Sequence, residues 1–191
     1  ETLLPGHGFP IFGKDRIKLA LETTSSFLRT IEDQTLLLMN QGKSLNQVLH
    51  EVSIPEDLMK HAWLKPIYDD PKFLIRMVWR RYGGWWDGEY DRLLPSSRNE
   101  EAAEWINLSG GVEKVIEKAL ELTAQDKNSI AANLIETAYH AEPDNEEVHA
   151  ARSHIYSEFS KKQSSSMGRN ILNHASLASA KGKRDLAQTE D

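Results

Sequence analysis

The chain has 191 residues, enough to bury a core of its own, and its 29 acidic and 23 basic side chains give a formal net charge of -6. Because phosphate neutralisation needs clustered Lys and Arg, this dispersed acidic composition argues against a nucleic-acid-binding surface. The absence of cysteine excludes disulfides and thiolate metal sites, and no run of about 18 apolar residues predicts a membrane span.

The first element is a turn, "PGHG", which follows a short segment whose Leu3 and Leu4 could end a strand. Residues 15–41 then carry apolar side chains at near-helical spacing. This spacing predicts one long helix, and Gly42 is a natural left-handed stop after it.

Two short helices are predicted next. Ser44 and Gln47 stand three residues apart at the start of an apolar run, as in a capping box. Pro55 suits the first turn of the following helix, "PEDLMKHAWLK". A strongly amphipathic helix then begins at Asp70-Pro71 and ends at the glycine pair of "RRYGGWWDG".

The second half of the chain also predicts helices alone. Residues 99–108 form one helix, and a pair of helices from residue 112 fits one tetratricopeptide-like unit. Small residues and a closing proline fall near the positions that this 34-residue pattern requires: Ala119, Ala131, Ala138 and Pro143. The alternative is any helical hairpin with alanine at its seam. Another helix runs to about residue 159, before a shift to polar composition.

His7 is the first candidate for chemistry. The glycines around it permit a tight corner from which the imidazole projects, as a metal ligand requires, whereas the alternative is a plain turn residue. The other six histidines have no metal-like spacing and are interpreted as surface or core residues of helices: His50, His61, His140, His149, His154 and His174.

Several strings together resemble a known family. "LLPGHGFPIFG" resembles the end of a metallo-β-lactamase-fold hydrolase domain, in which this corner supplies the last histidine of a binuclear zinc site. The later strings resemble, in the same order, the helical dimerisation domain of the alkyl sulfatases of that superfamily: "DQTLLLMNQGKSLNQV", "RRYGGWWDG", "AEWINLSGG", "AEPDNEEVHAA" and "GRNILNHASLASA". The resemblance implies that His7 derives from a metal ligand in a longer parent protein.

The same resemblance implies that the parent is a zinc-dependent hydrolase of sulfate esters with two zinc ions, whose remaining ligands lie upstream in an HxHxDH motif and in carboxylates. One ligand alone cannot hold zinc, so this piece is expected to be inactive and to bind no zinc tightly. The family also carries a Gly-Thr-x-x-His-Asn segment that is taken to protonate the leaving alcohol or hold the sulfate. Phe73 and Leu74 occupy those two positions here, which puts the sulfatase step in doubt.

Four residues are candidates for lining a substrate pocket. Arg76 and Arg80 give a basic helix face for a sulfate group, with a solvated charge row as the alternative. Trp85 and Trp86, beside glycines, are candidates for an apolar pocket that takes an alkyl chain, with burial in the core as the alternative.

We therefore expect an all-α helical bundle with a tetratricopeptide-like helix pair, preceded by a short loop from an α/β metallo-β-lactamase domain. Residues 1–14 are the expected remnant of the catalytic domain, 15–160 the dimerisation domain, and 161–191 a linker, a short helix and a frayed tail. The expected partners are a second copy and the missing catalytic domain. The alternative function is a non-enzymatic helical module that binds a peptide. Only one repeat unit is visible in the sequence, whereas repeat proteins usually need about three for stability.

Overall fold

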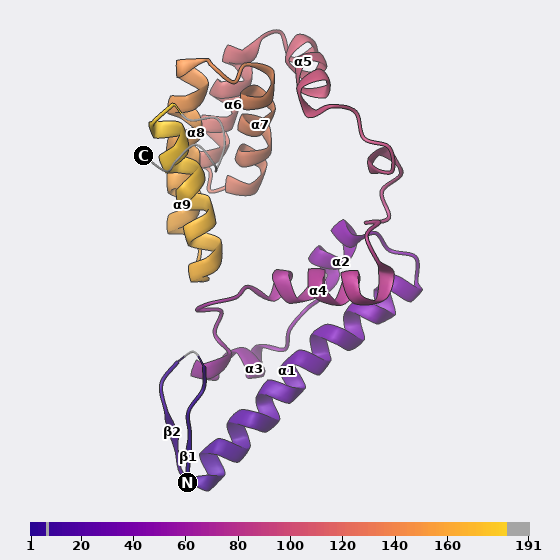
Figure 1. Cartoon of the computed structure of the whole chain (residues 1–191), viewed down its shortest axis with the longest axis vertical. Helices are drawn as coiled ribbons and strands as arrows, with labels where there is room; N and C mark the ends of the chain where they lie inside the picture. The colour runs from indigo at the N-terminus through magenta and orange to yellow at the C-terminus, as the bar shows by residue number, and fades with distance from the viewer. Residues whose placement is uncertain (7, 183–191) are drawn as a thin grey trace. The chain divides into compact units, whose positions relative to one another are not determined.

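The computed structural model describes residues 1–6 and 8–182, and its contacts group into two compact units, Glu1–Leu94 and Pro95–Asp191 (Figure 1). Regular structure in the described residues is helical apart from one pair of two-residue strands. The predicted all-α class is therefore confirmed. The predictions for His7 and for the tail at 183–191 fall outside the described residues.

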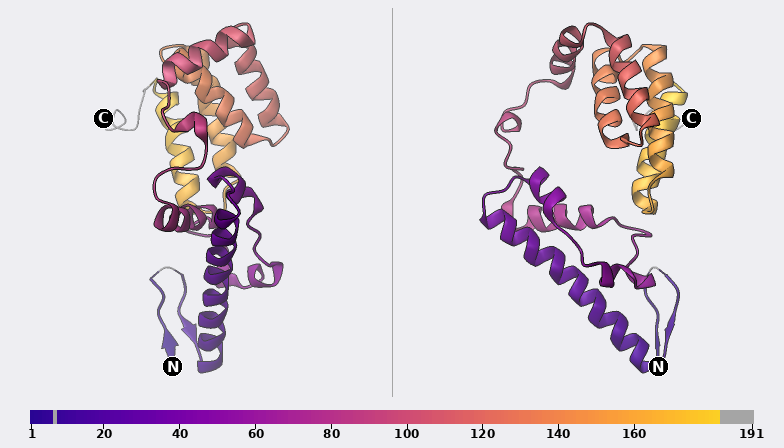
Figure 2. Two further views of the ribbon diagram at one scale, coloured as in Figure 1. Left: turned by 90° about the vertical axis from the view of Figure 1, so that its right-hand side faces the viewer. Right: turned by 180° about the vertical axis from the view of Figure 1, so that it is seen from behind.

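The first unit opens with a short antiparallel hairpin. Strand β1 (Thr2–Leu3) pairs with β2 (Ile11–Phe12), and the backbone N–H of Gly13 donates to the carbonyl of Glu1 over 3.1 Å. The hairpin lies beside the start of helix α1 (Lys14–Asn40), as both views in Figure 2 show. A strand ending at Leu3-Leu4 was expected, but its pairing with β2 was not, because two residues carry no readable alternation.

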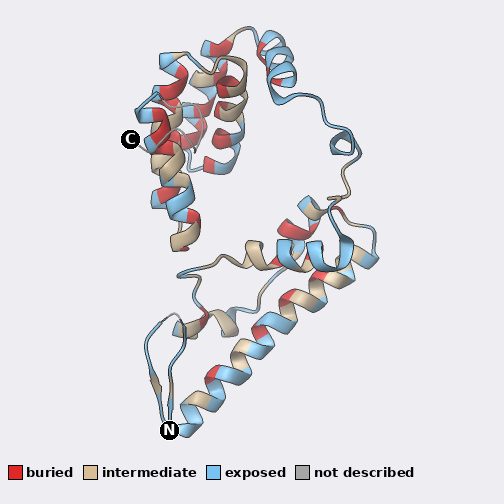
Figure 3. Cartoon of the chain, viewed as in Figure 1, coloured by how far each residue is buried: buried red, intermediate tan, exposed pale blue. Residues whose placement is uncertain are grey.

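Helix α1 packs against the rest of the first unit along a single stripe, which Figure 3 shows as buried segments that recur between intermediate and exposed ones. Its stop at Gly42, with φ 77°, is as predicted. Helix α2 (Leu45–Glu51) begins with the predicted capping box, in which Ser44 accepts from the Gln47 backbone and the Gln47 side chain accepts from the Ser44 backbone. These helices bury one cluster: Phe27, Ile31, Val48, Leu49, Leu64, Ile75 and Trp79.

The predicted helix "PEDLMKHAWLK" is wrong in extent. It consists of a four-residue helix α3 (Glu56–Met59) and a 3-10 turn η1 (Ala62–Leu64), separated by extended backbone at His61. Pro66 disfavours the helical conformation of Lys65, which has ψ 138°. The break also lets the Trp63 indole donate to the Thr23 hydroxyl of α1 over 2.9 Å.

Helix α4 (Pro71–Gly83) confirms its sequence signals, since the Asp70 carboxylate accepts from the Lys72 backbone over 2.8 Å and Pro71 occupies the first turn. The chain leaves the helix at Gly84, where φ is 82°. A second 3-10 turn, η2 (Tyr90–Arg92), follows.

The second unit is a stack of helices: α5 (Arg98–Ser109), α6 (Val112–Ala124), α7 (Asn128–Ala141), α8 (Glu146–Lys161) and α9 (Ser166–Ala180). The predicted seam between α6 and α7 is confirmed, because Ala119, Ala131 and Ala138 are each 0% exposed. Side chains of one methyl group let the two helices approach closely enough to exclude water from this seam.

Residues 161–182 belong to the second unit and pack on α8. Ser165 caps α9 by accepting from the Gly168 backbone over 3.1 Å, and the Ser176 hydroxyl donates to the Ser153 carbonyl of α8 over 2.8 Å. Helix α9 lies along α8 in both views of Figure 2. The division into units at Leu94 is one that composition did not indicate, and the expected domain bounds of 14 and 160 stay a prediction.

Candidate functional site

The turn after α4 separates the two tryptophans that were predicted to line a pocket. The buried Trp79 indole donates to the Trp86 carbonyl over 2.9 Å, and the Trp86 indole donates to the Glu89 carbonyl over 3.2 Å. Trp86 is therefore half-buried against its own unit. Trp85 is 81% exposed, so the alternative that both indoles lie in the core is wrong for Trp85.

Two contacts fix this turn to the start of α2. The Leu45 backbone donates to the Asp87 carbonyl over 2.7 Å, so the turn closes onto the N-terminus of that helix. Gly88 has φ 86°, and a Cβ there would lie 3.0 Å from the Ser44 Cα. A side chain at this position would be strained and would push the turn off α2, which is the physical reason for glycine.

Arg76 and Arg80 lie one turn apart on α4, and both are exposed. Phe73 and Leu74 are half-buried near the start of the same helix, and Leu74 packs on the core of the first unit. An apolar residue at position 74 therefore has a packing role. The pocket-lining role of the two arginines and two tryptophans stays a prediction.

The described residues do not fit a binuclear zinc site. Within residues 1–6 and 8–182, no group of three or more His, Asp or Glu side chains could hold a metal ion. The predicted ligand His7 lies outside that part of the chain. No reaction step through a metal is therefore assigned to these residues.

The remaining histidines have other contacts. His149 is buried in α8, where its Nε2 donates to the Pro143 carbonyl over 2.9 Å and its ring meets the edge of Tyr139. His50 donates to the Asn46 carbonyl over 2.8 Å on the surface of α2. His61 was interpreted as helical, but it precedes η1 and stacks on Trp63 at 4.9 Å.

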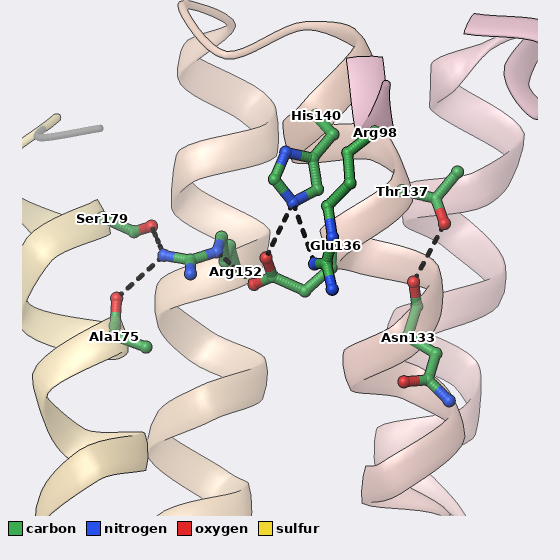
Figure 4. Close-up of polar contacts among 8 residues, drawn as sticks. All are labelled: Arg98, Asn133, Glu136, Thr137, His140, Arg152, Ala175 and Ser179. Atoms are coloured by element: carbon green, nitrogen blue, oxygen red, sulfur yellow. Dashed lines mark hydrogen bonds and ion pairs between the residues drawn. The ribbon is translucent and has the colours of Figure 1, made fainter. Parts of the chain in front are cut away.

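A charged cluster in the second unit was missed by the sequence analysis (Figure 4). The Arg152 guanidinium donates to Glu136 over 2.6 Å, to the Ser179 hydroxyl over 2.8 Å and to the Ala175 carbonyl over 3.1 Å. Its carbon Cζ also lies 4.4 Å from the ring centre of Tyr139. Because the Arg152 side chain is only 11% exposed, it needs these partners to offset its lost hydration.

This Arg152 cluster joins four helices. Arg152 on α8 connects to Glu136 on α7 and to Ser179 on α9, while His140 of α7 lies 3.4 Å from an Arg98 nitrogen of α5. Burial, with a smaller contribution from Glu136, raises the pKa of the Tyr156 hydroxyl beside it. In the sequence, only the spacing of four between Glu136 and His140 indicated a contact within this cluster. Arg152 lies 16 residues from Glu136, and no spacing rule predicts a contact at that separation.

Two surface pockets lie elsewhere in the second unit. The larger, about 520 Å³, lies at the start of α7 beside Phe159 and Lys162, and the smaller, about 240 Å³, lies between Trp105, Val115 and Leu134. Neither includes the residues that were predicted to line a substrate pocket. Among the described residues, the helices are all too short or too polar to traverse a bilayer.

Comparison with known proteins identifies relatives of this chain. A family model described as alkyl sulfatase dimerisation matches residues 44–182. A linear primary-alkylsulfatase of Pseudomonas sp. (strain ATCC 19151) is 30% identical over 117 residues, which are 61% of this chain and 22% of that protein. An (R)-specific secondary-alkylsulfatase of Pseudomonas sp. is 23% identical over 172 residues, which are 90% of this chain and 26% of that protein.

A solved structure of a stereoselective inverting sec-alkylsulfatase from Pseudomonas sp. has the same fold, with a TM-score of 0.88 at 22% identity over 95% of this chain and 29% of that one. The chain thus spans less than a third of the length of these relatives. The family match runs from the cap of α2 to the end of α9, so the free-standing repeat module is not supported. The chain belongs to the alkyl sulfatase dimerisation family.

Proposed function

We propose that this chain is the self-association domain of an alkylsulfatase-type hydrolase and that it forms a homodimer. The observation that carries the proposal is the amount of large apolar surface exposed on the first unit, in a chain of a dimerisation family. Folded chains rarely leave contiguous apolar patches in water unless another surface covers them.

Exposed apolar side chains occur on the hairpin, on α1, on α4 and in the turn after α4. Phe9 of the hairpin is 91% exposed, Leu37 of α1 57%, Met77 of α4 66% and Trp85 of the following turn 81%. A single exposed leucine needs no explanation, but aromatic residues and methionine are enriched where proteins associate. Burial of such side chains on association would remove apolar area from water, which favours the associated state.

Hydrolysis of sulfate esters belongs, in this proposal, to a longer protein that contains this chain. His7 would be one ligand of its two zinc ions, and the relatives' names, which are those of alkylsulfatases, support a substrate with a sulfate group. Phe73 carries no titratable group, so another residue would have to protonate the leaving alcohol. Arg76, Arg80, Trp85 and Trp86 would line the substrate pocket of that protein.

Sedimentation equilibrium of the 191-residue chain over a hundredfold range of concentration tests self-association. The expected result is a single species of twice the monomer mass of 21.7 kDa. A monomer at every concentration would refute the proposed role. Isothermal titration with zinc is the companion measurement, and submicromolar binding by the chain would show that a ligand set exists within it.

A further inference from the structure

Helix α4 carries a cluster of basic side chains that its own unit leaves unpaired. The helix has four cations and no acidic residue, in a chain with 29 acidic side chains and a formal net charge of -6. The four cations, which we call the basic face of α4, are all exposed: Lys72, Arg76, Arg80 and Arg81. None of them forms an ion pair with another residue in the part of the chain that the structure describes.

The basic face follows one side of the helix. Its first three residues are four positions apart, so they form a row about 12 Å long. Arg81 extends the face around the helix, and Met77, which is 66% exposed, lies between Arg81 and this row. At 100° per residue these exposed side chains cover about half of the circumference, and the buried Ile75 and Trp79 lie outside that arc. The face therefore presents positive charge with one apolar side chain within it.

Helix stability does not account for this pattern. Arg80 and Arg81, in the last turn, complement the negative end of the helix dipole. Lys72, in contrast, lies in the first turn, where the positive end of the dipole disfavours a cation. Arg76 has a cation four residues away on each side, and like charges at that spacing lower the stability of a helix. An anionic partner would offset both costs.

We infer that the basic face of α4 docks on an anionic lipid surface. A straight row of cations along one side of a helix meets a plane of headgroup charges over its whole length. Each of its guanidinium groups can also donate two hydrogen bonds to one lipid phosphate. Met77 and Trp85, which follows the helix and is 81% exposed, supply apolar contacts at the headgroup level, where tryptophan is enriched.

The negative net charge of the chain is compatible with this local attraction, because exposed charges more than about 10 Å apart are largely screened. The carboxylates near the ends of α4 have partners of their own. Asp70 accepts from the backbone at the start of the helix over 2.8 Å, and Glu32 accepts from the Tyr82 hydroxyl over 2.7 Å. Asp87 pairs with Arg92 at 3.3 Å.

The inferred contact goes beyond self-association and does not require it. Only its purpose rests on the proposed function. An alkyl sulfate has a charged head and an apolar chain, so it partitions into a lipid layer, where a hydrolase docked through α4 would meet it.

The test is co-sedimentation of the 191-residue chain with sucrose-loaded vesicles at about 50 mM salt. The chain should bind vesicles of phosphatidylcholine with about 30 mol% phosphatidylglycerol and should not bind phosphatidylcholine alone. Lys72→Gln with Arg81→Gln removes two cations of the basic face that are not proposed for the substrate pocket. Each basic residue near an anionic surface contributes about fivefold to binding, so the partition coefficient should fall about 30-fold.

The matched control is Lys14→Gln with Arg29→Gln, which makes the same chemical changes at two exposed positions of α1. Its partition coefficient should stay within about threefold of that of the unsubstituted chain, and far-UV circular dichroism checks that both variants remain folded. An equal loss in the two variants would show that only net charge matters and would overturn the inference. Equal binding to both kinds of vesicle, or to neither, would overturn it as well.

A further arm separates a lipid surface from a free anion. Inorganic phosphate at about 1 mM hardly changes the ionic strength, so it should leave vesicle binding intact. Loss of binding at that concentration would indicate a site for a free anion and overturn the inference. The result is independent of oligomeric state: a dimer that does not bind vesicles refutes only this inference, and a monomer that binds them refutes only the proposed dimer.

Discussion

Replacing Glu136 with alanine should lower the free energy of unfolding of the second unit by about 2–3 kcal/mol. The change leaves the Arg152 guanidinium, on a side chain only 11% exposed, without its carboxylate at 2.6 Å. Breaking a fully buried ion pair costs about 3–5 kcal/mol, because the remaining charge is unpaired. The lower value here reflects the 25% exposure of Glu136 and the two bonds that Arg152 keeps, to Ser179 and Ala175.

Two variants separate the charge from other effects. Glu136→Gln retains a side-chain oxygen that can accept from Arg152, so it should cost only about 1 kcal/mol, the difference between a charged and a neutral hydrogen bond. Glu158→Ala removes a pair with the same 2.6 Å distance, Glu158 to Lys161, but Lys161 is 63% exposed. Water already solvates that pair, so its loss should have no measurable effect on unfolding.

The assay is urea unfolding followed by far-UV circular dichroism, at one fixed protein concentration because self-association contributes to stability. The expected order of destabilisation is Glu136→Ala, then Glu136→Gln, then Glu158→Ala. Equal effects of the two alanine variants would refute the reasoning, since burial would then not decide the strength of an ion pair in this unit.

Three further predictions concern the capping box of α2, the alanine seam between α6 and α7, and the protonation of Tyr156. Ser44→Ala should remove the capping box of α2 and lower the stability of the first unit by about 1 kcal/mol in the same urea assay, and no change would show that the cap is redundant. Ala138→Leu should overpack the seam between α6 and α7, costing about 1–3 kcal/mol, whereas the exposed Ala150→Leu should not. The raised pKa of Tyr156 means that the unfolded chain loses this proton first, so stability is full below pH 10 and falls above it by about 1.4 kcal/mol per pH unit. Tyr156→Phe should reduce that fall in thermal melts between pH 9 and 11, and an identical pH profile would contradict the assignment.

Much of the helical structure could be read from local signals. The capping box at Ser44, the proline turn after Asp70 and the alanine seam at Ala119 were all predicted and are all present. Each of these signals operates within one or two helical turns, where the chain's own spacing fixes which groups meet. The prediction of one continuous helix around His61 was wrong. The Trp63 indole contacts Thr23, 40 residues earlier in the chain, and no local pattern indicates such a contact.

The candidate site was less predictable for the same reason. Trp85 and Trp86 were predicted as a pair, but the closure of the turn on α2 leaves Trp86 half-buried and Trp85 81% exposed. The Arg152 cluster depends on contacts across 16 and 27 residues, which no spacing rule indicates.

The sequence by itself determined the positions of the main helices, the close-packed alanine seam and the family, because short-range periodicity, caps and motif order are properties of the chain alone. Only the tertiary structure decided which side chains remain in water, such as Leu37 of α1 and Trp85 after α4, and which are enclosed, such as Arg152. Burial depends on which residues from distant parts of the chain pack against a side chain. Local sequence patterns do not contain that information.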